Sequence, residues 1–146
     1  MSRKKIIIIH PGTQHAYRLA NALAENPNIY QVKLYTWFLL SEGHFLTRYN
    51  FFKKRVKKIN RNVLVYNFPL FELLLILHNQ FKSVLKREVN HNPNYYWQTV
   101  FGYFLLPILF FQRKKIILVT FETCGWPITK YAKKWNIPIV MDFPSI

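Results

Sequence analysis

The sequence predicts an α/β domain built on a Rossmann-like, mainly parallel sheet with helices on both faces. Short β-branched runs alternate with amphipathic segments along the whole chain, and this alternation calls for a parallel sheet that is covered on both sides. The chain has 146 residues, of which 51% are apolar and 18% aromatic, so one domain spanning residues 1–146 can fill a sizeable core. The sequence contains no internal repeat, no low-complexity tract and no obvious interdomain linker.

Strands are expected where short apolar runs are bounded by turn residues. The first run, KKIIIIH, has four consecutive isoleucines, which is typical of a strand buried on both faces. We expect Ile6–Ile9 and Ile117–Val119 to lie on adjacent central strands of the sheet. The expected strands cover residues 4–10, 31–37, 61–68, 115–121 and 137–143.

Helices are expected between the strands, where apolar residues recur at intervals of three and four. The first helix shows this spacing and stops before the sequence ENPN, whose proline and asparagines break it. The helix over 95–111 is apolar on all sides, and Pro107 is expected to interrupt it. The expected helices cover residues 16–23, 45–61, 71–86, 95–111 and a segment that begins near Pro127.

The charge balance predicts an anionic partner. A total of 21 Lys and Arg against 6 Asp and Glu gives a formal net charge of +15, which suits nucleic acid, an acidic membrane surface or a phosphorylated substrate. The single cysteine, Cys124, excludes an internal disulfide and indicates a reducing, cytoplasmic compartment. Because Cys124 has no partner cysteine, we expect no zinc site, and we expect no other metal and no bound cofactor.

Two apolar runs, 68–77 and 100–111, fall short of the roughly 20 residues that a membrane-spanning helix needs. Buried helices are the favoured interpretation, and helices that dip into one leaflet are the alternative. The amino terminus does not resemble a signal peptide, because its apolar run, Ile6–Ile9, is too short.

The expected helix over 45–61 combines an apolar stripe with a dense basic surface. Such a helix suits an anionic bilayer, which indicates a protein at the periphery of a membrane. Nucleic acid is the alternative partner. It is less favoured because the aromatic residues Phe45, Tyr49 and Phe52 fall on the apolar stripe and not among the charges. The candidate anion-binding residues are Arg48, Lys53, Lys54, Arg55, Lys57, Lys58 and Arg61.

The turn HPGTQH, at residues 10–15, follows the first strand at the edge where open parallel sheets bind ligands. Gly12 allows a tight turn, and the following helix points free N–H groups into the crevice. The dinucleotide fingerprint needs three glycines and the turn has one, so a structural turn without a ligand is an equal alternative. His10 is a candidate acid/base, and a structural, hydrogen-bonded histidine is the alternative interpretation.

Both ends of the chain resemble the amino-terminal domain of family 4 glycosyltransferases, which have the GT-B architecture. The sequence IIIIHPGTQHAYRLANAL is similar to the first strand of that family, its Pro/Gly-containing loop and a helix of the form R-L-A-x-A-L. At residues 132–138 the pattern A-K-x-x-x-I-P precedes a strand that closes on Asp142. The layout is similar over the whole chain, and the residue detail is similar at the two ends.

The resemblance implies transfer of a sugar from a nucleotide-sugar donor to a lipid-linked or glycan acceptor, with the acceptor on the amino-terminal domain. The E-x7-E motif with which the family's carboxyl-terminal domain holds the donor is absent from these 146 residues. The sequence therefore resembles half of such an enzyme, inactive alone and completed by a separate carboxyl-terminal domain. The alternative is a non-catalytic, basic α/β module that binds nucleic acid or an anionic membrane.

Loop position and resemblance together give the candidate site residues. His10 and Glu122, each directly after an expected strand, are the candidate catalytic residues. The family's catalytic histidine has no counterpart here, because the sequence after the fourth strand, ETC, holds none. His15 can bind substrate or cap its helix, and Asp142 can bind acceptor hydroxyls or cap a following helix. The candidate substrate-binding residues are Gly12, Thr13, Gln14, His15 and Asp142.

Overall fold

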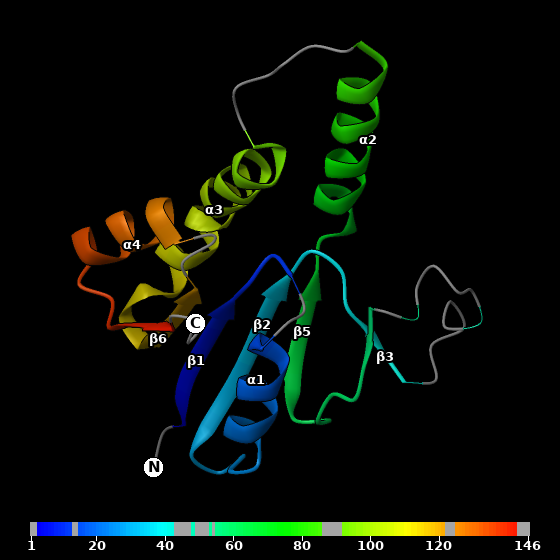
Figure 1. Ribbon diagram of the computed structural model, residues 1–146. Helices are drawn as coiled ribbons and strands as arrows, with labels where there is room; N and C mark the ends of the chain where they lie inside the picture. The colour runs from blue at the N-terminus through cyan, green and yellow to red at the C-terminus, as the bar shows by residue number, and fades with distance from the viewer. Residues whose placement is uncertain are drawn as a thin grey trace.

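The computed structural model describes residues 3–12, 15–42, 48, 53, 55–85, 92–121 and 125–142. Its centre is a five-stranded sheet of order β5-β2-β1-β6-β7, in which every neighbouring pair is parallel (Figure 1). The strands are β1 (Lys4–Ile9), β2 (Tyr30–Thr36), β5 (Val63–Asn67), β6 (Ile116–Phe121) and β7 (Ile139–Asp142). The α/β class and the Rossmann-like sheet are confirmed, because β1 is central and the chain builds outward from it in both directions.

The two strands expected at the centre are neighbours. Ile6 of β1 lies opposite Ile117 of β6, and Ile8 lies opposite Val119. The isoleucines of β1 are buried on both sides of the sheet, as a parallel strand between two helical layers requires.

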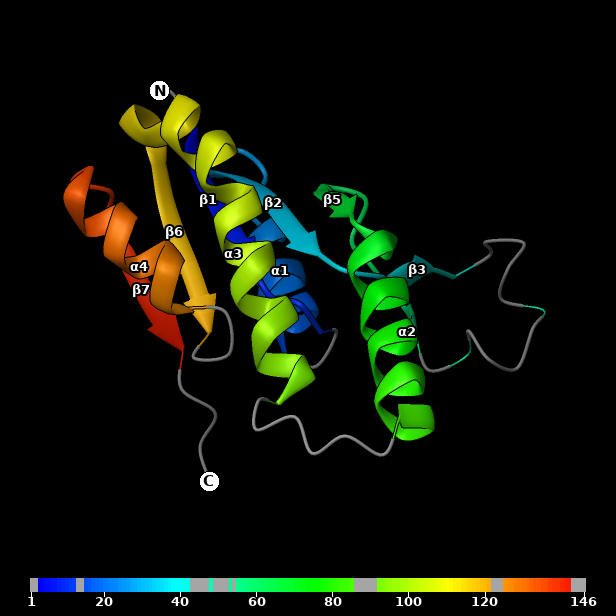
Figure 2. The same cartoon turned by 90° about the horizontal axis from the view of Figure 1, so that it is seen from above.

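Helices cover both faces of this sheet (Figure 2). On one face, Ile6 and Ile8 pack against α1, whose fully buried residues are all alanine, with Leu19 and Leu23 partly buried beside them. On the other face, Ile7 and Ile9 belong to a cluster that includes residues of α3 and α4. The helices are α1 (Ala16–Ala24), α2 (Pro69–Leu85), α3 (Pro93–Gln112) and α4 (Gly125–Lys134), with a short 3-10 turn, η3 (Arg113–Lys115), after α3.

The expectation that Pro107 interrupts its helix is wrong, because α3 continues through it to Gln112. Proline removes one helical hydrogen bond and its ring crowds the preceding turn. Here Pro107 is exposed, while Leu105 and Leu109 on either side of it are buried in the core. Packing of these flanking residues holds both halves of the helix on the sheet.

The expectation of buried helices is confirmed for one face of α3 and wrong for most of α2. On α3, Tyr103, Phe104, Phe110 and Phe111 are exposed. Phe101, Leu105 and Leu109 of α3 are core residues, whereas Phe71 is the buried side chain among the described residues of α2. Figure 1 shows the reason: α2 rises past the end of the sheet. In the described part of the chain, no helix has the length and apolar character to cross a bilayer.

The basic helix expected over 45–61 is wrong over residues 56–61, whereas the described residues 48, 53 and 55 have 3-10 helical backbone. Val56–Lys57 forms a strand, β4, which pairs in parallel with β3 (Leu40–Ser41). The backbone after β4 is held by Asn21 of α1, whose side chain donates to the Lys58 carbonyl (2.8 Å) and accepts from the Asn60 N–H (2.9 Å). Partners outside the segment thus satisfy backbone groups that a helix would pair internally.

Candidate functional site at the carboxyl edge of the sheet

The strand order reverses between β1 and β6. The chain passes from β1 to β2 and β5 on one side, then crosses back to β6 and β7 on the other. In open α/β sheets, ligands bind outside the carboxyl ends of the strands at such a reversal. His10 directly follows β1, whose carboxyl end lies beside that of β6 (Figure 2).

His10 is held by contacts from several strands and is only 7% exposed. Its N–H donates to the Tyr35 carbonyl of β2 at 3.1 Å. Its ring meets the ring of Phe121, the last residue of β6, edge to face with 4.6 Å between centroids. Its Nδ1 lies 2.7 Å from the Gly12 carbonyl oxygen. Because a carbonyl can only accept, Nδ1 carries the proton, and Nε2 is the basic nitrogen of the neutral ring.

Gly12 lies so close to His10 that any side chain here would push the imidazole aside by a few tenths of an ångström. A Cβ atom at Gly12 would lie 3.2 Å from Cε1 of the His10 ring. The Gly12 carbonyl also accepts from the Thr36 hydroxyl (3.2 Å), and the Pro11 carbonyl accepts from the Trp37 N–H (3.3 Å). The turn after β1 is therefore fixed to the end of β2, and the imidazole is fixed to the turn.

Tyr35, near the end of β2, and Trp37, directly after β2, are buried aromatic residues. Burial raises the pKa of Tyr35 above its ordinary value, against the opposing effect of a hydrogen bond with Gln112, so its phenol stays neutral at physiological pH. Its ring stacks on that of Tyr66 with 4.8 Å between centroids. The buried Nε1–H of Trp37 has no acceptor among the described residues.

The structure describes only some of the other residues that the sequence predicts for this site. His15 is exposed at the start of α1, and the alternative that its side chain caps this helix is wrong. Asp142 ends β7, with its backbone opposite Phe121, so it reaches the carboxyl edge two strands from His10. The side chain of Asp142, together with Thr13, Gln14 and Glu122, lies outside the described residues. The structure thus brings His10, Gly12 and the backbone of Asp142 to one edge.

The basic residues predicted to share one helical face do not form such a face. Arg55 forms an ion pair with Glu72 of α2, and the Lys57 ammonium lies 5.6 Å from the ring centroid of Tyr17. Arg48, Lys53, Lys58 and Arg61 are exposed, and Lys54 lies outside the described residues.

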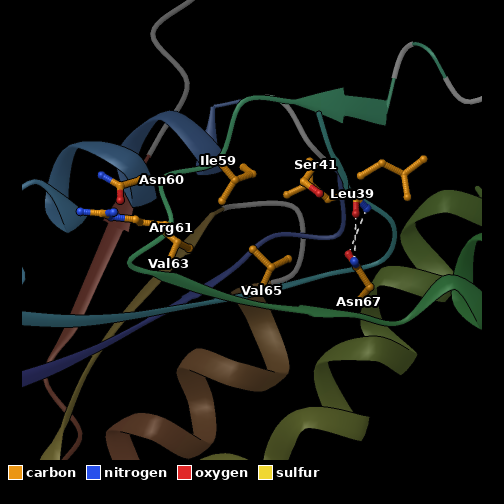
Figure 3. A pocket seen from close by; sticks show the side chains of 9 residues that line it. Leu39, Ser41, Ile59, Asn60, Arg61, Val63, Val65 and Asn67 are labelled. Carbon is orange, nitrogen blue, oxygen red and sulfur yellow. Dashed lines mark hydrogen bonds between the residues drawn. The ribbon is translucent and has the colours of Figure 1, made fainter. Parts of the chain in front are cut away.

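A cavity of about 320 Å³ lies beside β5, under the segment that replaces the expected helix (Figure 3). Asn67 closes one end of it: its amide donates to the Leu39 carbonyl (2.9 Å) and accepts from the Leu39 N–H (3.0 Å). Sequence reasoning missed this pair, although an asparagine at the end of a strand is a common partner for nearby backbone. The cavity is lined by Leu39, Leu40, Ser41, Ile59, Asn60, Arg61, Val63, Val65 and Asn67.

Replacing Asn67 by alanine is expected to lower the free energy of unfolding by about 1–2 kcal/mol, because two partly exposed hydrogen bonds are lost. Hydrogen exchange at the Leu39 amide should accelerate at the same time. Asn79→Ala, on the exposed surface of α2, is the matched control and should change stability by less than about 0.5 kcal/mol. An unchanged exchange rate at Leu39 would contradict the described pairing.

Comparison with protein-family models, with curated proteins and with solved structures gives no match in any of the three. Within the described residues, no group of three or more His, Cys, Asp or Glu side chains could hold a metal ion. The resemblance to glycosyltransferases therefore rests on the quoted residues, and the functional argument rests on the geometry of the carboxyl edge.

Proposed function

We propose that this domain is the acceptor-side, amino-terminal domain of a GT-B-type glycosyltransferase, with its site at the carboxyl ends of β1 and β6. The observation that carries the proposal is His10. It is buried at the reversal of strand order, and its Nδ1 is bound to the Gly12 carbonyl, so Nε2 is the nitrogen of the neutral ring that can accept a proton.

The chemistry that this histidine suits is deprotonation of an acceptor hydroxyl. As the acceptor oxygen bonds to the anomeric carbon of the sugar, its proton passes to Nε2 of His10. The bond between the anomeric carbon and the nucleotide's phosphate oxygen breaks, and the nucleotide leaves with that electron pair. Neither a metal nor another cofactor enters this step.

The surface beside this edge favours a lipid-linked acceptor. Helix α2 follows β5 at the carboxyl edge and rises beyond it (Figure 1). Four of its apolar residues, spaced three or four apart on one face, are exposed. Apolar surface next to a polar site suits a substrate with a hydrocarbon chain. These residues are Leu70, Leu73, Leu77 and Phe81.

Titration of the isotopically labelled 146-residue chain with a panel of nucleotide-sugars and short-chain lipid-phosphate acceptors tests the proposal. An acceptor is expected to shift the amide signals of Ile9, His10, Gly12 and Phe121. Multiple-turnover transfer is expected only after a GT-B carboxyl-terminal domain is added, because orientation of both substrates in one cleft can contribute about 7–11 kcal/mol. Shifts confined to other surfaces would refute this function. Robust transfer by the 146-residue chain alone would refute the proposal that it is only half of such an enzyme.

A basic α/β module that binds nucleic acid or an anionic membrane is the second candidate. The charge favours it: the chain carries a formal net charge of +15, and one of its six acidic residues, Glu72, is already paired with Arg55. Tight, salt-dependent binding of duplex DNA or anionic vesicles, with no response of the carboxyl edge to any acceptor or nucleotide-sugar, would favour this module.

A further inference from the structure

A cavity of about 670 Å³ lies at the amino ends of β1 and β6, on the opposite edge of the sheet from His10. Figure 2 shows the elements that meet there: the end of α3, the start of β6 and the amino terminus. We propose that this cavity binds an anion that carries two or more phosphate groups.

Charge is the first argument. Five basic side chains from two distant segments line the cavity, and its lining contains no acidic residue. None of the five takes part in the ion pair that the described residues form, Arg55–Glu72. Like charges gathered around one cavity repel one another, and a polyanion removes that cost. The five are Lys4, Lys5, Arg113, Lys114 and Lys115.

The sheet register brings the two segments together. Lys5 of β1 lies opposite Ile116, the first residue of β6, so Lys4 and Lys5 face the turn that carries the other three cations. Cations after α3 also have an ordinary role, because they interact favourably with the helix carboxyl end. That role does not account for Lys4 and Lys5, which belong to a strand.

Packing contacts hold Arg113 and Trp135 at the wall of the cavity. The guanidinium carbon of Arg113 lies 3.8 Å from the ring centroid of Phe110, and Arg113 also donates to the Phe110 carbonyl. The Phe110 ring packs on Trp135, which itself lines the cavity. Next to it, Asn136 has a left-handed φ of 54° and ends α4 with an N–H bond to the Lys133 carbonyl. A preorganised guanidinium among mobile ammonium groups suits phosphate oxygens.

Phosphates rather than a single carboxylate match this site because five cations need several negative charges for balance. A free polyphosphate and the phosphorylated headgroup of a lipid share this chemistry. The site faces away from the carboxyl edge, so the inference stands apart from the proposed glycosyltransferase function.

Calorimetric titration of the chain with inorganic tripolyphosphate, at about 0.15 M ionic strength, tests the inference. Changing Lys4, Lys5, Lys114 and Lys115 to Gln should weaken binding by about tenfold or more. The matched control changes Arg18, Lys130, Lys133 and Lys134 to Gln, which are exposed, do not line the cavity and carry the same total charge. It should bind tripolyphosphate almost as tightly as the parent. Urea unfolding of both variants checks that neither has lost its fold.

Vesicles that contain a doubly phosphorylated inositol lipid distinguish the two sources. A lipid headgroup is identified if the variant of the cavity lysines loses vesicle binding and the control variant keeps it. A soluble anion is identified if the chain binds tripolyphosphate but not the vesicles. Equal weakening in both variants would show only general charge attraction and would overturn the inference. No binding of either probe, or far tighter binding of duplex DNA through the same residues, would also overturn it.

Discussion

Replacing Phe101 of α3 by alanine is expected to lower the free energy of unfolding by about 3–5 kcal/mol. The side chain is 0% exposed. Its ring lies 5.0 Å from that of Phe71, 5.6 Å from that of Phe68 and 6.2 Å from that of Trp37, measured between centroids. Removing it opens a cavity that the surrounding strands and helices cannot all close, so both burial and packing are lost.

Phe111→Ala on the same helix is the matched control. That ring is 85% exposed, and its removal should change stability by less than about 0.5 kcal/mol. Urea unfolding followed by circular dichroism gives both values from the shift in midpoint. Similar losses for the two variants would mean that α3 does not pack on the sheet through Phe101.

Elements whose periodicity agrees with their tertiary environment could be predicted from the sequence. The isoleucines of β1 and the alanine-rich α1 are cases in which local pattern and burial agree. The segment over 45–61 is the opposite case. Its apolar residues recur at helical intervals. The backbone of residues 56–60 is nevertheless held by β3 and by Asn21 of α1. No local pattern reveals a partner in another helix.

The position of the candidate site could be predicted from the sequence, whereas the contacts between its atoms could not. A turn after the central strand of an α/β sheet lies at the ligand-binding edge, so His10 and Gly12 could be selected from their place in the chain. The tautomer of His10 and the role of Gly12 depend on atoms that come together only when β2 and β6 flank β1. The amino-edge cavity was missed for the same reason: its cations lie near both ends of the chain and meet through the sheet register.

His10→Gln is expected to reduce the rate of sugar transfer, in the complemented assay, by about 10²–10⁴-fold. The glutamine side chain is uncharged and cannot take up the proton that Nε2 accepts. His78→Gln is the matched control, since His78 lies on α2, outside the connection between β1 and α1, and contacts Trp97 of α3. It should leave the rate close to that of the parent chain.

Stability and pH dependence separate catalysis by His10 from support of the turn. The Gly12 carbonyl keeps its hydrogen bond from Thr36 when His10 is replaced, so the loss of stability should be only about 1 kcal/mol. The neutral imidazole is the active form of a base, so transfer by the parent should decline as His10 becomes protonated at low pH. That acidic decline should disappear in the residual activity of His10→Gln. A variant that is merely less stable, with an unchanged pH profile and rate, would show that His10 positions the turn and takes no proton.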